Sequence, residues 1–199
     1  MKRQSLIICL TDNFWLYRGV AAMLPEMNVV RVDYGDTNFF VSAQSQNKKV
    51  ILVMDMSVFL SGEWTAFDNI IGQKPEAKVI WLKRPDSGLI FPTTRVGDPI
   101  IEQKQNFRDL YQQLRGCVFC SPQKQADDFV EPFILTRKES NLLLYLIHDL
   151  DIRLIAKWSG IAMKTLYHHR RAILKKAGFA RLDMMQLVFR KNLHLLNRK

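Results

Sequence analysis

The chain has 199 residues, of which 48% are hydrophobic and 24% are charged, and its formal net charge at pH 7 is +10. This hydrophobic content supports a packed core and excludes wholesale disorder. No apolar run reaches the roughly 18 residues of a transmembrane helix, and three cysteines are too few for a disulfide framework. We therefore expect a cytosolic (cytoplasmic) protein with one large or two small domains.

The positive charge is unevenly distributed along the chain. Residues 1–132 contain 15 Lys and Arg and 15 Asp and Glu, whereas residues 133–199 contain 14 basic and 4 acidic residues. The whole excess of +10 therefore lies in the last third. Such an asymmetry is typical of a segment that binds nucleic acid or a membrane surface.

The first part of the chain alternates between strand-like and helix-like segments. Five apolar runs have the length of β-strands: Ser5–Leu10, Asn28–Val32, Val50–Met54, Lys78–Leu82 and Asp98–Ile101. Helical spacing of apolar residues is found in Phe14–Leu24, Glu63–Gly72 and Asn106–Gly116. The segment Arg84–Pro99 is rich in Pro and Gly, so a helix there is expected to be short or absent. This order predicts an α/β domain over residues 1–116, with a five-stranded parallel sheet covered on both faces.

The rest of the chain is predicted to be a linker followed by an all-α domain. Residues 117–132 are mostly polar and include two prolines, which indicates the linker, and residues 133–199 have helical patterns. Thr136 and Glu139 form a capping box that predicts a helix start near Arg137. Asp151 is expected to cap a helix over Ile152–Trp158, and a glycine turn over Ser159–Ile161 then leads into the next helix.

That next helix is strongly cationic. The segment Lys164–Arg181 contains six Lys and Arg, two His and no acidic residue, whereas a solvated surface helix normally mixes both signs. Two helices joined by a short turn, with a cationic second helix, are typical of a helix-turn-helix. Leu166, Ile173 and Ala177, and in part Ala172, are expected to face inward. The side chains expected on the open side are those of Lys164, Tyr167, His168, Arg171 and Lys175.

The motifs LTRKE (135–139), IRLIA (152–156) and GIAMKTLYHHRRAILKKAG (160–178) resemble the LuxR/NarL-type (FixJ-type) helix-turn-helix of bacterial transcription regulators. Ten positions match without gaps: Leu135, Thr136, Glu139, Ile155, Ala156, Ile161, Thr165, His169, Ile173 and Lys176. The resemblance implies binding to double-stranded DNA. It implies that Tyr167, His168 and Arg171 reach the major groove, with Arg171 the candidate for a bidentate guanine contact. It assigns phosphate contacts to Lys164, Thr165, His169 and Lys175.

Three positions depart from this family pattern. Ala162 replaces the serine that usually caps the recognition helix, a loss expected to cost ~1 kcal/mol of local helix stability. Asp149 replaces a glycine, and Leu154 replaces a glutamate. Specificity is therefore expected to depend in part on a partner chain. In this family the last helix, here Asp183–Leu196, often dimerises; the alternative is that it only closes the small core.

The first domain resembles the receiver domains that often precede this type of helix-turn-helix. Asp12 retains one of the two acids that follow the first strand of a receiver, and Thr11 replaces the other. Asp55, at the end of the third strand, stands at the position of the phosphate-accepting aspartate. Lys83 replaces the usual Thr or Ser after the fourth strand. These residues, Asp12, Asp55 and Lys83, form the candidate phosphoacceptor pocket.

Several of these differences indicate a degenerate receiver, or pseudo-receiver. Phosphoryl transfer to Asp55 needs Mg²⁺, which prefers clustered carboxylates, and two acids instead of three weaken that site. Lys83 is expected to pair with Asp55 as a permanent counter-charge. The usual lysine after the fifth strand maps to Gln103 or Lys104. We therefore expect independence from phosphorylation and no cofactor, with Mg²⁺ needed only if the pocket functions. The alternative is a response regulator phosphorylated on Asp55.

Other reactive residues give weak signals. Cys117 and Cys120 have the spacing of a redox or metal motif, but the pair stands alone, so redox sensing is not favoured. The adjacent His168 and His169 point apart on a helix, so no metal site is expected. No arrangement of nucleophile and base indicates an enzyme.

The sequence as a whole predicts a sequence-specific DNA-binding transcription regulator. It is expected to act as a homodimer, or as a heterodimer with another regulator, and no membrane partner is expected. A second alternative is an adaptor that acts through another transcription factor and contacts DNA weakly.

Overall fold

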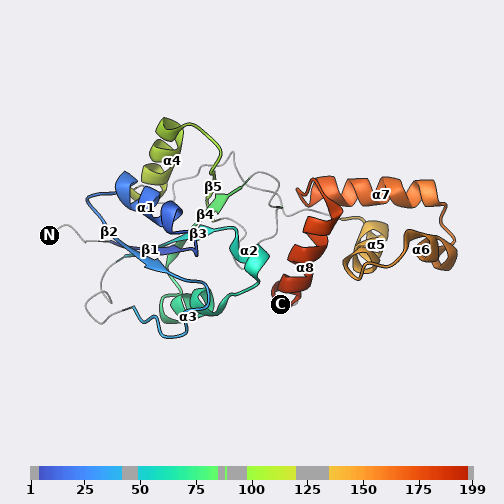
Figure 1. Ribbon diagram of the computed structural model, residues 1–199, viewed down its shortest axis with the longest axis horizontal. Coiled ribbons are helices and arrows are strands. Elements are labelled where there is room, and N and C mark those ends of the chain that lie inside the picture. The colour runs from blue at the N-terminus through green and yellow to red at the C-terminus, as the bar shows by residue number, and fades with distance from the viewer. Residues whose placement is uncertain (1–4, 42–48, 85–87, 89–97, 120–134, 197–199) are drawn as a thin grey trace. The chain divides into compact units, whose positions relative to one another are not determined.

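The computed structural model describes residues 5–41, 49–84, 88, 98–119 and 135–196 (Figure 1). The chain divides into two compact units, one formed by Met1–Pro85 and Gly97–Asp128 and the other by Asp86–Val96 and Phe129–Lys199. Among the helices in the described ranges, none combines the length and the apolar character needed to cross a bilayer.

The first unit contains a five-stranded parallel sheet with the strand order β2-β1-β3-β4-β5. Its strands are β1 (Leu6–Leu10), β2 (Asn28–Val32), β3 (Val50–Asp55), β4 (Lys78–Lys83) and β5 (Ile100–Glu102). Every residue of β1 and β3 is buried, as expected for central strands of a sheet covered on both faces. The predicted parallel sheet is thus confirmed.

The helices of this unit are α1 (Phe14–Met23), α2 (Val58–Ser61), α3 (Thr65–Gln73) and α4 (Phe107–Phe119). Figure 1 shows α1 and α4 on one face of the sheet and α3 on the other. The first face buries alternate strand residues such as Ile7 and Val53 under Val20 of α1 and Leu114 of α4. The short helix α2 was not predicted from the sequence.

The second face of the sheet is closed by aromatic side chains. Phe59, Trp64, Phe67 and Trp81 have ring centroids 5.0–6.4 Å apart. Trp64 and Trp81 are almost fully buried. Cys9 is also buried, and that burial, reinforced by the negative charge of Asp55, raises the pKa of its thiol to about 12. Cys9 is therefore a packed core residue.

The predicted linker begins too early. Helix α4 continues beyond Gly116 to Phe119, and Val118 packs into the core, so residues 117–119 belong to the helix. The helix continues because Val118 lies one turn beyond Leu114 and extends the same buried stripe. The remainder of the predicted linker lies outside the described residues, as does nearly all of Arg84–Pro99.

The described part of the second unit consists of four helices: α5 (Arg137–Ile147), α6 (Ile152–Ser159), α7 (Met163–Lys176) and α8 (Leu182–Leu196). Helix α5 contacts α7 and α8, and α6 contacts α7. Their shared core contains Leu142, Leu146, Ile155, Leu166, Ile173 and Phe189. The capping box of Thr136 and Glu139 is present, and the Asp151 carboxylate accepts a hydrogen bond from the Arg153 main-chain N–H at 2.8 Å. Both predicted helix starts are therefore confirmed.

The connection between α5 and α6 contains a left-handed aspartate. Asp149 has a φ of 57°, in the left-handed region that favours glycine. Its carboxylate accepts a hydrogen bond at 3.1 Å from Gln186, and Gln186 also donates to the carbonyl of Leu146 at 2.7 Å. These contacts join the end of α5 to α8.

Candidate functional site

Helix α7 carries a row of exposed polar side chains opposite its buried face. Leu166 and Ile173 are buried against the rest of the unit. Spacings of four, three and four residues place the exposed side chains of Lys164, His168, Arg171 and Lys175 on one face of the helix. At 3.6 residues per turn, that face lies opposite Leu166. We call these four residues the α7 row.

Side chains on both sides of the α7 row complete the candidate interface. Tyr167 is 43% exposed, and the guanidinium carbon of Arg170 lies 4.8 Å from the centroid of its ring. This cation–π contact holds the tyrosine ring beside the row. Thr165 is exposed on the opposite side, and His169 is half-buried. All five side chains predicted on the open side of this helix are exposed.

Arg170 was not assigned a role from the sequence. Its position three residues after Tyr167, where two helical side chains meet, was the signal that could have found it.

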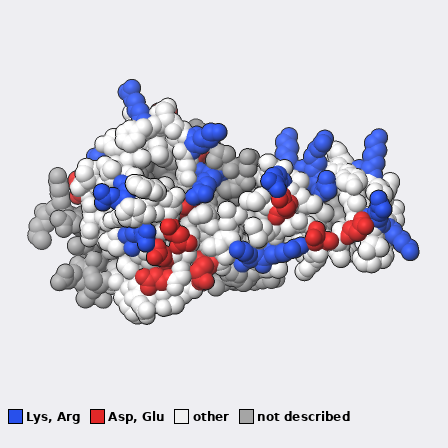
Figure 2. Space-filling model, viewed as in Figure 1, with Lys and Arg blue, Asp and Glu red and all other residues white. Residues whose placement is uncertain are grey.

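Basic side chains dominate the edge of the unit along which α7 runs. Figure 2 shows Lys and Arg side chains projecting in succession from this edge, with the visible Asp and Glu side chains of the unit below them. Because the exposed charges on this edge have one sign, they favour a polyanionic partner.

One cation of α7 has an internal partner. The Lys176 ammonium donates to the Glu139 carboxylate at 2.7 Å, and the main-chain N–H of Thr136 donates to the same oxygen at 2.7 Å. The hydrogen bond from Lys176, followed by that from Thr136, lowers the pKa of Glu139 to about 2. The pair joins the last turn of α7 to the first turn of α5. It therefore adds a polar contact to the burial of Leu166 and Ile173, which turns the α7 row outward.

The turn before α7 provides no side-chain cap. Helix α6 ends at Ser159 and is followed by Gly160, which has a φ of 65°. Ala162 occupies the N-cap position of α7 without a side-chain hydrogen bond. The missing cap that the sequence predicts is confirmed. The main chain still starts the helix, because the Ala162 carbonyl accepts from the Thr165 N–H at 2.9 Å.

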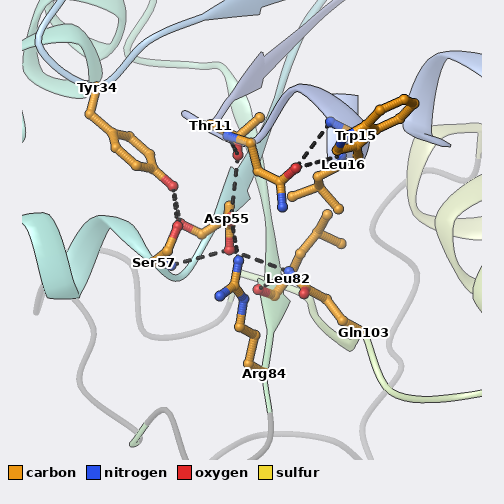
Figure 3. Close-up of polar contacts among 10 residues, drawn as sticks. Thr11, Trp15, Leu16, Tyr34, Asp55, Ser57, Leu82, Arg84 and Gln103 are labelled. Atoms are coloured by element: carbon orange, nitrogen blue, oxygen red, sulfur yellow. Dashed lines mark hydrogen bonds and ion pairs between the residues drawn. The ribbon is translucent and has the colours of Figure 1, made fainter. Parts of the chain in front are cut away.

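The second cluster of polar residues surrounds Asp55 at the carboxyl end of β3 (Figure 3). Its carboxylate is fully buried. Thr11 Oγ1 and Arg84 Nη2 donate to Oδ2, each at 3.2 Å. The main-chain N–H of Ser57 and the Gln103 side-chain amide donate to Oδ1, at 3.1 and 3.3 Å. Four protein donors thus satisfy the carboxylate, and Arg84 balances its charge.

Two residues predicted for this pocket have other contacts. Lys83 does not pair with Asp55, so that prediction is wrong: its ammonium lies 3.6 Å from the Glu102 carboxylate. The reason is strand register, because Lys83 is directly opposite Glu102 in the β4–β5 pair. The next residue, Arg84, supplies the cation instead. Asp12 is exposed, and its carboxylate accepts from the main-chain N–H of Tyr34 at 3.3 Å.

Tyr34 extends the network around Asp55. Its hydroxyl donates to the main-chain carbonyl of Asp55 at 3.1 Å and shares a hydrogen bond of 2.7 Å with the Ser57 hydroxyl. Burial, followed by the negative charge of Asp55, raises the pKa of Tyr34 well above its usual value. The phenol is therefore a permanent hydrogen-bond donor.

Sequence reasoning missed part of this network. Of the two candidates for the position after the fifth strand, Gln103 contacts Asp55 and Lys104 is exposed. Tyr34, Ser57 and Arg84 were not anticipated; a second cation directly after Lys83 was the one available signal.

The hydrogen-bond donors around Asp55 do not suit the binding of Mg²⁺. This ion requires several oxygen ligands, whereas Asp55 is surrounded by donor groups, one of them a guanidinium cation. Within the described ranges, no group of three or more His, Cys, Asp or Glu side chains could hold a metal ion. Cys117 is half-buried, and Cys120 lies outside those ranges.

No protein-family model and no curated protein matches the chain. Solved structures of RcsB resemble it over almost its whole length. A complex of the two-component response regulator RcsB with DNA has a TM-score of 0.63 and 16% identity, covering 94% of this chain and 98% of the RcsB chain. A structure of two RcsB dimers bound to two parallel DNAs has a TM-score of 0.63 and 18% identity, covering 98% and 100%.

A third similar structure is that of RcsB from Salmonella enterica serovar Typhimurium bound to promoter P1flhDC in the presence of phosphomimetic BeF3⁻. It has a TM-score of 0.63 and 17% identity, covering 93% of this chain and 99% of the other. The sheet of the first unit and the helices of the second are both within these matches. The chain therefore has the two-domain fold of the response regulator RcsB.

Proposed function

We propose that the protein is a sequence-specific DNA-binding transcription regulator and not an enzyme. The observation that carries this proposal is the α7 row, which lies opposite a buried face in the part of the chain that holds the whole charge excess. Helices α6 and α7 then act as a helix-turn-helix, and α7 enters the major groove. The RcsB structures with the same fold are DNA complexes, which supports this assignment.

The exposed side chains divide into two proposed roles. Arg171 has the fork geometry for a bidentate contact with guanine, and Tyr167 and His168 reach neighbouring base edges. Side chains along and beside the row hold phosphates and set the position of α7 on the duplex: Lys164, Thr165, His169 and Lys175.

We also propose that two copies act together. The support in this chain comes from exposed aromatic side chains at the starts of α1 and α4: Trp15 is 80%, Phe107 69% and Phe14 49% exposed. The RcsB comparison includes dimers on DNA. Two copies would read paired half-sites about one helical turn apart. Another regulator with similarly exposed aromatic side chains could replace the second copy.

Independence from phosphorylation is the third part of the proposal. The Asp55 carboxylate already has four donors and a counter-cation, so phosphate and Mg²⁺ would have to displace Thr11 and Arg84. The rival function is a response regulator activated on Asp55, which the position of this residue at the end of β3 favours. Incubation with acetyl phosphate and Mg²⁺, followed by mass spectrometry, separates the two: labelling of the wild type that is lost in Asp55→Asn would refute our proposal.

Footprinting of genomic DNA with the purified chain tests the main function. We expect protection of paired half-sites by the wild type. Arg171→Ala should bind different operators with nearly equal affinity, since it lacks the base contact. If Arg171→Ala discriminates between operators as the wild type does, α7 is not the helix that contacts the bases. If no DNA is protected at any salt concentration, the function itself is wrong.

A further inference from the structure

Helix α6 exposes most of its surface, including two large apolar side chains. Of its eight residues, all of which are described, Ile155 is the buried one. Trp158 is 62% exposed and Leu154 is 44% exposed. Residues four apart lie on the same face of a helix, so these side chains form one apolar stripe. Neither belongs to the core of the unit, so the fold does not explain them.

A cationic stripe lies beside the apolar one. Arg153 and Lys157 are also four residues apart and exposed, and each precedes a residue of the apolar stripe. A rotation of about 100° per residue therefore places the two stripes next to each other. We call the four residues together the α6 surface.

The cations of the α6 surface have no acidic partner in the described part of the chain. Residues 133–199 contain four acidic residues, and all four are engaged elsewhere. Their contacts are Glu139 with Lys176, Asp149 with Gln186 and Arg190, Asp151 with the main chain of α6, and Asp183 with Arg181. Among the described residues, no acid forms an ion pair with Arg153 or Lys157. Arg153 and Lys157 are therefore available to pair with the carboxylates of a partner protein.

We infer that the α6 surface is a docking site for an acidic amphipathic helix of a partner protein. The apolar face of such a helix would cover Trp158 and Leu154, and its carboxylates would pair with Arg153 and Lys157. Trp and Arg are the residues that most often dominate the affinity of protein interfaces. Duplex DNA fits less well, because its phosphates give an exposed indole and leucine no apolar surface to cover. The inference does not depend on DNA binding by α7.

The test uses the full chain and a synthetic helical peptide with leucines four residues apart, flanked by glutamates and labelled with a fluorophore. Fluorescence anisotropy should show binding that weakens as salt is added. Trp158→Ala should weaken binding about 30-fold, as expected for the centre of an interface. Lys157→Gln should weaken it about two- to fivefold, as expected for an exposed ion pair. Leu187→Ala, a matched exposed leucine on α8, should leave it unchanged.

Four results would overturn the inference. The first is that the wild type does not bind the peptide, or that wild type and Trp158→Ala bind it equally. The second is equal binding of a peptide with lysine in place of glutamate. The third is a loss of DNA affinity in Trp158→Ala as large as that in Lys175→Ala, which would assign the surface to DNA. The fourth is a shift toward monomer in Trp158→Ala during sedimentation, which would assign it to a second copy. An unchanged circular dichroism melt shows that each variant is folded.

Discussion

Replacement of Glu139 by glutamine should destabilise the second unit at neutral pH. The variant retains the shape of the side chain but loses the charge that pairs with Lys176. A pKa of about 2 in place of the ordinary 4.5 corresponds to about 3 kcal/mol of stabilisation by linkage. Solvent screens this pair, because the Lys176 side chain is 38% exposed. We therefore expect a loss of about 2 kcal/mol in the free energy of unfolding.

The sign of the pH dependence follows from the direction of the shift. Folding lowers the pKa of Glu139, so its contribution is complete above the ordinary pKa of 4.5 and disappears as the pH falls through about 2. The difference between wild type and Glu139→Gln should be largest near pH 7. It should fall below half of that value by about pH 3.

Urea unfolding followed by NMR signals of α5 and α7 measures this difference for the second unit alone. Asp183→Asn is the matched control, because Asp183 is an exposed acid paired with Arg181 in the same unit, and its removal should have a smaller effect. Equal stability of Glu139→Gln and wild type at pH 7, or a difference that grows toward low pH, would refute the reasoning. The pair between α5 and α7 would then not stabilise the second unit.

Four further outcomes follow from the structure. Arg84→Ala should cost about 3 kcal/mol in a urea melt by leaving a buried carboxylate unpaired, and adding Asp55→Asn should recover most of it; additive losses would contradict this. Ala162→Ser should stabilise α7 by about 1 kcal/mol, seen as slower amide exchange in its first turn. Lys175→Ala should weaken binding to all DNA sequences alike. In gel-shift titrations it should reduce the slope of log affinity against log salt concentration by about one. Cys9 should resist alkylation at pH 8 until the chain unfolds, and rapid labelling of the native protein would disagree with its burial.

Local patterns predicted most of the fold. The central strands are continuous apolar runs, and the structure places β3 and β4 within one residue of the predicted bounds. The capping box of Thr136 and Glu139 fixed the start of α5 because both of its hydrogen bonds are local. Helical spacing likewise predicted the exposed face of α7. The short α2 was missed because four residues carry too little periodicity.

The polar network around Asp55 could be predicted only in part. Its position follows from the end of an apolar strand, whereas its partners depend on contacts between distant segments. The sequence favoured Lys83, and the structure uses Arg84, because the β4–β5 register pairs Lys83 with Glu102. Tyr34 is 21 residues from Asp55 along the chain, and no local pattern connects them.

The cation beside Asp55 has a consequence for how such a protein would be controlled. Arg84 is made together with the chain and cannot be withdrawn by a phosphatase or supplied by a kinase. If the protein is the regulator proposed above and this unit holds one state, its effect on gene expression would depend on its rates of synthesis and degradation, or on the amount of a partner protein. The response time of the cell would then be set by protein turnover, which is slower than a covalent modification.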